Sequence, residues 1–450
     1  MSTPAVSTEP LPRSARRAAW AGFVGTFIEY YDFALYGVMT VYFAPLFFPA
    51  DNPATSVLTG LAVFGAGFVA RPLGGILFGR IGDRHGRRTA LIASILLMGM
   101  CSTLVAVLPT YESIGMAAPV MLTLLRLGQG LSAGSEMLGS VTYVLESVPR
   151  NRRAFMASMT PMGALAGGTA SSVVAAILVA FLGGDAMASY GWRLAFAIAA
   201  PLSILALVVR SRLEDSPEFT DMVREEKVVR TPLREVLTVH RRNLLIAGGV
   251  ALAANGAPNV AIWCTTYLLS DRGLPGTTVF MASAVTGVPI ALLSLVAGRL
   301  TDRFGHRKVL IGVLVGYVVI TFPVLYLIAR VDSFFEIAAV LALFFALSAL
   351  VQAPAFTFIA ERFPAQVRYT GANFGQNIGT VFGSGIAPFV AALLFVGTGS
   401  TLGVGIWVVG VCIVAFVALS FRSIHYVAGI STGDDTAETV VPGDVARERA

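Results

Sequence analysis

Long apolar stretches, separated by short polar segments, recur along almost the whole chain. An α-helix needs about 20 apolar residues to cross the hydrocarbon core of a bilayer, and twelve stretches approach or exceed that length. They cover residues 18–46, 57–79, 89–108, 117–140, 154–181, 192–210, 244–268, 278–298, 308–328, 334–358, 369–396 and 402–421. The pattern predicts an all-α membrane protein with twelve transmembrane helices.

The longest polar interruption, residues 211–243, follows the sixth stretch. It divides the chain into an N-terminal six-helix half (18–210) and a C-terminal six-helix half (244–421), which it connects as a central cytoplasmic loop. Residues 1–17 form a cytoplasmic N-terminus, and residues 422–450 are predicted to be a disordered cytoplasmic tail. The first stretch is longer than the apolar region of a signal peptide, so we expect it to be retained as a helix.

Basic residues concentrate in every second polar segment. The segment after the second stretch carries Arg80, Arg84 and Arg88, whereas the segments on the opposite side hold only Arg272 and Arg330. Positively charged loops stay preferentially in the cytoplasm, so both termini are predicted to be cytoplasmic. The net charge of +6 is dispersed among these clusters, and we therefore expect no nucleic-acid partner.

Composition and motifs argue against an enzyme or a metalloprotein. Only 13% of the residues are charged, whereas soluble domains have about 25%. Cys101, Cys264 and Cys412 lie in separate apolar stretches without paired spacing. The histidines have no catalytic neighbours, and the chain lacks a Gly-Lys-Ser/Thr nucleotide loop. We expect no catalytic residues, no metal and no cofactor.

A ten-residue segment is repeated in the two halves. The sequence GRIGDRHGRR (79–88) follows the second stretch, and GRLTDRFGHR (298–307) follows the eighth, with six of the ten positions identical. A second pair of segments shares a Glu-x-x-Pro pattern followed by an Arg (146–153 and 361–368). Two six-helix halves that both start inside are parallel repeats, which place a substrate site between them near the midplane and can rock to alternate access.

The repeated segments predict a cytoplasmic gate. An aspartate in such a loop can accept hydrogen bonds from a neighbouring helix end or from an arginine, and the glycines permit close backbone approach. The alternative is a charged turn that only fixes the helix ends. The candidate gate residues are Gly79, Asp83, Arg84, Gly86, Arg88, Glu146, Arg153, Asp302, Arg303, Gly305, Arg307, Glu361 and Arg368.

The paired loops resemble the signature of the major facilitator superfamily, from about residue 18 to residue 421. Four further segments are similar to the metabolite:proton symporters, the branch that carries shikimate, 2-oxoglutarate, citrate, and proline or betaine. They read IEYYDFALYG (28–37), ARPLG (70–74), RLGQGLSAGSE (126–136) and LEDSPEF (213–219). Ser135 stands where that branch usually has a glycine. The resemblance implies a multi-pass transporter of the bacterial inner membrane.

Ionisable residues inside membrane spans are functional candidates because burying them is costly. In the first stretch Glu29 and Asp32 share a helix face, and in the fourth Arg126, Gln129 and Glu136 form one stripe. Asp32 and Arg126 both come near the middle of the membrane, so they can meet. The alternative is that the two form a fixed ion pair. Because the acids outnumber the nearby cations, we predict proton coupling and charge relay by Glu29, Asp32, Arg126 and Glu136.

The second half offers neutral polar side chains instead of charges. Its amides are candidates for binding a polar substrate, and the alternative is that they connect helices by hydrogen bonds. With polar residues of the first half, the substrate-binding candidates are Tyr30, Tyr36, Arg126, Gln129, Asn255, Asn259, Trp263, Gln352, Asn373, Gln376 and Asn377.

These features predict a monomeric, proton-coupled symporter that imports a small polar metabolite, with a proton as the coupling ion. Arg126 favours an organic acid as the substrate, through a bidentate clamp on its carboxylate. A zwitterion of the betaine or proline type is an alternative if Asp32 fully satisfies Arg126. A drug or metabolite antiporter is a second one, although PMGALAGG (161–168) lacks the Gly-Pro step typical of such antiporters. A sensor that does not transport is a third.

Overall fold

The computed structural model describes residues 13–51, 53–227, 229 and 231–421. Every regular element in these residues is helical, which confirms the all-α prediction. Most of the expected N-terminal segment and the whole expected tail lie outside the described residues.

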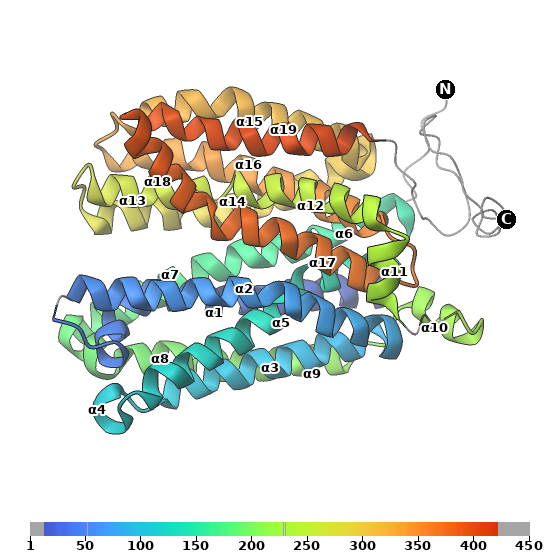
Figure 1. The fold of residues 1–450 in the computed structure, drawn as a ribbon, viewed down its shortest axis with the longest axis horizontal. Helices are drawn as coiled ribbons and strands as arrows, with labels where there is room; N and C mark the ends of the chain where they lie inside the picture. Colours follow the sequence, from blue (N-terminus) through green and yellow to red (C-terminus); the bar gives the residue numbers. More distant parts are fainter. Residues whose placement is uncertain (1–12, 52, 228, 230, 422–450) are drawn as a thin grey trace.

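The N-terminal half is built from long helical passes that run side by side (Figure 1). Short connecting elements join them. The elements are α1 (Arg13–Phe47), α2 (Pro53–His85), α3 (Arg87–Val107), α4 (Tyr111–Ile114), α5 (Ala117–Ser147), η1 (Arg150–Arg152), α6 (Arg153–Ala157), α7 (Met159–Ala186), η2 (Met187–Gly191), α8 (Trp192–Ala197) and α9 (Ala199–Ser211).

The C-terminal half follows two short helices in the central segment, α10 (Pro217–Arg224) and α11 (Pro232–Thr238). Its elements are α12 (Arg241–Gly256), α13 (Val260–Ser270), α14 (Gly276–Phe304), α15 (His306–Ile328), α16 (Phe334–Glu361), α17 (Arg368–Thr380), η3 (Val381–Gly385), α18 (Ala387–Thr398), η4 (Thr401–Val404) and α19 (Gly405–Ser420).

Nine helical runs within the described residues are long and apolar enough to cross a membrane. One of them, Arg153–Ser211, contains two passes, because the chain turns at Gly183, where φ is 77°. The helices α1 and α5 are not among the nine, since polar and charged side chains lower their mean hydropathy, but both are long enough to span. With these passes the structure has the twelve that the sequence predicts.

The two halves pack face to face, as Figure 1 shows for the blue-to-green and yellow-to-red parts of the chain. Helix α2 lies against α17, α5 lies against α16 and α17, and α7 lies against α14. Small residues bring backbones together inside the first half: a Cβ added at Gly134 would overlap the backbone of Arg71. Gly163 and Gly167 of α7 pack in the same way on the backbone of α1. Gly163 and Gly167 of the fifth stretch therefore serve close helix packing, whereas a Cβ at Gly168 would meet nothing within 4 Å.

One end of the bundle carries the repeated loops and the central helices α10 and α11, and we call it the basic end (Figure 1). Gly86 joins α2 to α3 with φ 99°, and Gly305 joins α14 to α15 with φ 82°. Residues that carry a side chain rarely adopt such positive φ values, so a glycine is needed at both chain reversals. The two reversals occupy equivalent places in the two halves.

Candidate functional site

The central polar cluster of the first half contains Asp32 and Arg126, and the two residues meet as predicted. Gln129 lies between them: its Nε2 donates to Asp32 Oδ2 at 2.5 Å, and its Oε1 accepts from Arg126 Nη1 at 2.7 Å. Ser102 Oγ accepts a second hydrogen bond from Gln129, at 2.9 Å. Arg126 Nη1 lies 3.9 Å from Asp32 Oδ2. The two side chains are therefore linked more closely through Gln129 than by direct contact.

Arg126 is buried without a full set of hydrogen bonds. Its Nε and Nη2 donate to no partner in the described part of the chain, and Asp32 Oδ1 accepts from none. Aromatic rings cover the guanidinium instead, with centroids of Tyr36 at 4.0 Å and Phe33 at 4.7 Å. The Tyr36 hydroxyl donates to Gly60 O at 3.3 Å, which holds the ring over the guanidinium in this conformation. The unused donors of Arg126 are the main binding capacity of this cluster.

Glu29 lies beside a different arginine. Arg71 of α2 contacts Glu29 Oε1 at 3.5 Å, while Glu29 Oε2 has no partner within the described residues. Phe33 and Phe68 flank the Arg71 guanidinium, at 4.5 and 4.7 Å. Tyr30, the neighbouring substrate candidate, is half-buried against the core.

Glu136 is bound by Arg210, which lies at the end of the predicted N-terminal half. Arg210 is 1% exposed; Nη1 donates to Glu136 Oε2 at 2.8 Å and Nη2 donates to Oε1. Ser94 and Ser140 donate to the same carboxylate. The expected excess of acids is therefore absent: each of the three acids lies against an arginine. Glu29 and Asp32 keep an unpartnered oxygen, whereas Glu136 does not.

In the second half, two spans are interrupted at the same level. The seventh span breaks between α12 and α13 at residues 257–259, and the eleventh passes through the π-helical turn η3. Asn259 Nδ2 donates to Ser384 Oγ at 3.0 Å and so joins the two breaks. Trp407 Nε1 donates to Gly256 O at 3.1 Å, which satisfies one freed carbonyl. Irregular backbone at membrane depth is tolerated where it is buried or lines a cavity, and broken helices build many transporter binding sites.

The amides of the second half divide into two groups. Asn373 and Asn377 donate to carbonyls of their own helix, and Asn377 also donates to Gly134 O of α5. Gln376 Nε2 reaches Asn255 Oδ1 at 3.5 Å, and Gln376 Oε1 and Gln352 Oε1 are buried without a partner in the described structure. Asn377 thus connects the halves, while Gln352 and Gln376 retain hydrogen-bonding capacity.

Trp263 belongs to an aromatic group beyond the break in the seventh span. Its ring stacks on Tyr267 with centroids 5.3 Å apart and contacts Phe395 at 5.6 Å. With 5% exposure it is almost entirely buried, so it forms a wall of α13 rather than an open binding surface in this conformation.

At the basic end, each repeated aspartate caps the start of a helix in the other half. Asp83 accepts from the backbone N–H groups of Tyr369 and Thr370, at 3.2 and 2.9 Å. Asp302 accepts from those of Ala154 and Phe155, at 2.8 and 2.9 Å. Helix N-termini attract negative charge. The two halves are therefore held together at two equivalent places, in each of which an aspartate of one half accepts hydrogen bonds from a helix N-terminus of the other.

Arg87 is the central cation among the candidate gate residues, and the sequence did not single it out. It is fully buried, and it donates to both oxygens of Glu146 at 3.1 and 3.2 Å, to Asp83 Oδ1 at 2.9 Å and to Ala365 O at 2.6 Å. Of the candidates beside it, Arg84 Nε has no partner in the described residues, and Arg88 donates to Ser211 O at 2.7 Å. Arg87 lies four residues after Asp83, and this spacing was the feature of the sequence that could have indicated their ion pair.

The central segment completes this gate. Glu218 of α10 contacts Arg153 at 3.5 Å and also binds Arg368, which contacts Glu146 at 3.1 Å. Ser216 donates to Glu146 at 2.5 Å. Arg153 and Arg368 are the repeated arginines of the two halves, and one carboxylate from the connecting segment bridges them.

The equivalent place in the second half is occupied by a histidine. His306 Nδ1 lies 3.5 Å from Glu361, as Arg87 lies beside Glu146. Arg303 is exposed over the ring of Phe304, and Arg307 is half-buried. A Cβ added at Gly79 would lie 2.9 Å from Thr370, so that glycine permits the contact of α2 with α17.

Comparison with known proteins gives one consistent picture. The sequence model of the Major Facilitator Superfamily matches residues 22–290 and 244–442. An inner membrane metabolite transport protein of Escherichia coli (strain K12) is 34% identical over 389 residues, which is 85% of this chain and 88% of that protein. The shikimate transporter of the same strain is 34% identical over 394 residues, 84% and 88% of the two chains.

Solved structures agree on the fold. The proton:xylose symporter bound to 6-bromo-6-deoxy-D-glucose superposes with a TM-score of 0.70 at 16% identity, over 90% of this chain and 94% of that chain. This likeness confirms the predicted arrangement of the helices. With the sequence matches, it also confirms the prediction of a multi-pass protein of the bacterial inner membrane.

Proposed function

Because the chain belongs to the major facilitator superfamily and is therefore a membrane transporter of metabolites rather than an enzyme, we propose that it is a proton-coupled symporter. It imports a small organic acid by alternating access, as a monomer and with a proton as the only coupling ion. The basic end faces the cytoplasm, in keeping with the placement of positive charge in membrane proteins.

The observation that carries the proposal is the geometry around Asp32. This carboxylate is fully buried, leaves Oδ1 without a partner, and lies 3.9 Å from Arg126. Protonation of Asp32 at the unpartnered Oδ1 removes its negative charge, weakens the hydrogen bond that Oδ2 accepts from Gln129, and leaves Arg126 without a close anion. A substrate carboxylate can take that place. The proton and the substrate thereby become linked through one arginine.

The unpartnered Nε and Nη2 of Arg126 support a carboxylate substrate. Two parallel N–H groups of a guanidinium match the two oxygens of a carboxylate. The guanidinium is 0% exposed, so the substrate reaches it only after Phe33 or Tyr36 moves. In the second half, Gln352 and Gln376 would bind the polar remainder of the substrate.

The gate supports alternating access. In this conformation Asp83, Arg87, Glu146 and Asp302 hold the basic end closed. These contacts have to break when the substrate is released to the cytoplasm. Their repetition in both halves fits a symmetric rocking motion.

Uptake into proteoliposomes with and without an imposed proton gradient tests the proposal. Wild-type protein is expected to accumulate an organic acid such as shikimate against its gradient only when the outside is acidic. Asp32→Asn should abolish driven accumulation while exchange of internal for external substrate continues. Ser102→Ala, which removes another partner of Gln129 but no charge, is the matched control. Driven accumulation by the Asp32→Asn protein would contradict the proposal.

A zwitterionic substrate is the second candidate, since Asp32 and Arg126 present opposite charges 3.9 Å apart. Competition separates the two. An organic acid should inhibit uptake and glycine betaine should not if the carboxylate alone is recognised. The reverse pattern would favour the zwitterion.

A further inference from the structure

Two grooves at the basic end have no part in the gate or the central cluster. Each lies between the first and the last helix of its half. One is formed by α12 and α19 and has a volume of about 240 Å³. The other is formed by α1 and α9 with the residues that follow α9, and has a volume of about 480 Å³. The grooves occupy equivalent positions in the two halves.

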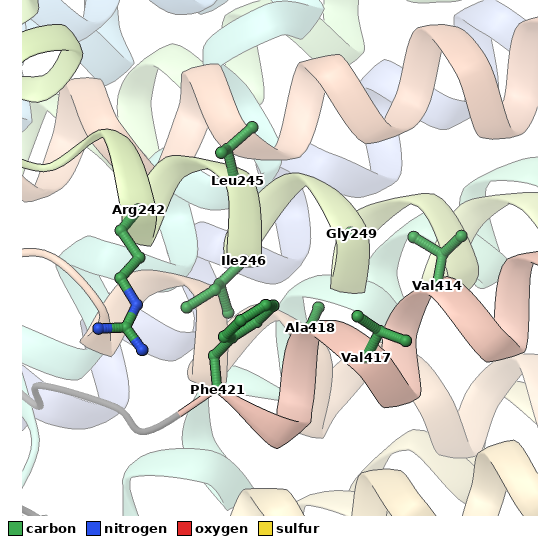
Figure 2. Close-up of a pocket in the computed structure, with 8 residues that line it drawn as sticks. All are labelled: Arg242, Leu245, Ile246, Gly249, Val414, Val417, Ala418 and Phe421. Carbon is green, nitrogen blue, oxygen red and sulfur yellow. The ribbon is translucent and has the colours of Figure 1, made fainter.

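The α12/α19 groove has a charged end and an apolar floor. Figure 2 shows Arg242 projecting from α12 beside Phe421, with Val414 and Val417 of α19 further along the groove and Gly249 opposite them. The Arg242 guanidinium lies 5.6 Å from the Phe421 ring. Val417 is 52% exposed on this outer surface. Among the described residues that line the groove, every side chain except Arg242 is apolar.

Behind Arg242 lies a second arginine, Arg362, that forms no ion pair within the described residues. Arg362 is 1% exposed, and its Nε and Nη1 donate to no partner in the described chain. Burial and the neighbouring charges of Arg307 and Arg242 lower the pKa of Arg362. Asn243, next to Arg242, donates to Arg362 O at 2.8 Å, so the start of α12 directly contacts this arginine. An anion beside Arg242 would offset the repulsion among these three guanidinium groups.

The α1/α9 groove repeats the same design. Arg16, Arg17 and Arg212 line it, together with Trp20 and apolar side chains of α9. Trp20 is 54% exposed, the position expected for a tryptophan in the interfacial region of a bilayer. An aromatic ring beside arginines, next to an apolar floor, is therefore found in both halves.

We propose that each groove binds an anionic phospholipid of the leaflet at the basic end. The phosphate binds the arginines and one acyl chain lies along the apolar floor. Arginine forms bidentate hydrogen bonds with phosphate oxygens, and basic pockets between transmembrane helices bind anionic head groups. The apolar floor distinguishes a lipid from free phosphate, which has no chain to fill it.

Native mass spectrometry of the full-length protein with phosphatidylglycerol and phosphatidylethanolamine tests the head-group part. The protein should retain phosphatidylglycerol in preference to phosphatidylethanolamine. Arg242→Gln should weaken binding of the lipid in the α12/α19 groove by about fivefold and leave the α1/α9 groove unchanged, as expected from roughly 1 kcal/mol for each basic residue near a membrane surface. Arg224→Gln is the matched control, because that side chain is 78% exposed at the same end and lies outside both grooves. Equal loss in both variants would overturn the proposal.

Two further measurements test the acyl chain. Val417→Trp fills the α12/α19 groove and should weaken retention of phosphatidylglycerol, with the melting temperature unchanged. Phosphatidylglycerol brominated on its acyl chains should quench Trp20, so the quenched signal should fall in Trp20→Phe. Unchanged retention in the Val417→Trp protein, or equal quenching by brominated phosphatidylethanolamine, would overturn the proposal.

Discussion

Arg87 holds both carboxylate oxygens of Glu146, at 3.1 and 3.2 Å, and neither side chain is exposed to solvent. The same guanidinium contacts Asp83 and the Ala365 carbonyl, so it joins α3, α2, α5 and the segment that precedes α17. A buried bidentate pair of this kind is costly to break on one side only. The closed gate therefore depends on Arg87 more than on the arginines next to it.

Replacing Arg87 tests this dependence. Arg87→Gln leaves Asp83 and Glu146 buried with one cation fewer, and we expect the stability of the closed state to fall by about 3–5 kcal/mol. Maleimide labelling of Thr370→Cys, a position that is fully buried in the closed gate, should become faster. Arg84→Gln is the control and should change the labelling rate little. Equal rates in the two variants would show that Arg87 does not hold the gate.

A bulky side chain at Gly139 should also open the gate. A Cβ at this position would overlap the hydroxyl of Tyr369, which belongs to the other half. We expect Gly139→Val to favour conformations with the basic end open, measured by the same labelling of Thr370→Cys. Gly168→Val is the matched control, because a Cβ there meets nothing within 4 Å. If the two valine variants label alike, close approach at Gly139 is not required for closure.

Variants of Glu136 and Arg210 test whether Glu136 stabilises the fold or takes part in proton coupling. Glu136→Gln leaves Arg210 buried without its anion, so the melting temperature should fall. The double variant Glu136→Gln/Arg210→Gln should recover part of the loss, with an interaction energy of about 0.5–3 kcal/mol in a double-mutant cycle. Proton-driven uptake should persist in the double variant. A protein of normal stability that has lost only its proton dependence would instead assign Glu136 to coupling.

The break in the seventh span should depend on Trp407. Trp407→Phe keeps the aromatic packing but leaves the Gly256 carbonyl without the indole N–H. We expect a loss of stability of about 1–3 kcal/mol, and weaker substrate binding because Asn255 and Asn259 lie beside the break. Thermal unfolding and substrate titration measure the two effects. Trp192→Phe, in the core of the other half, is the comparison and should leave substrate affinity unchanged.

Much of the fold could be predicted from the sequence because it depends on lengths and repeats. Apolar stretches long enough to span the membrane define the twelve passes, and the duplicated loop relates the two halves. The meeting of Asp32 with Arg126 followed from counting residues along two helices. These inferences need only helix geometry and the thickness of a bilayer.

What could not be predicted depends on side-chain direction. Arg84, Arg87 and Arg88 belong to the same basic segment, and nothing in the segment distinguishes them. The backbone turn at Gly86 directs Arg87 into the interior. Arg210 lies at the end of an apolar stretch, where a basic residue usually marks the membrane surface, yet its long side chain turns back to Glu136. No pattern within a single helix contains this information, because each partner comes from another helix.

Glu218 gives the segment between the halves a mechanical role. In the closed state its carboxylate reaches Arg153 of the first half with one oxygen and Arg368 of the second half with the other. If α6 and α17 separate in the proposed rocking motion, one carboxylate cannot span both arginines, so it has to remain with one half and release the other. We therefore expect Glu218 to stay with one arginine and to release the other in each proposed transport cycle, so that the retained arginine determines which half α10 moves with.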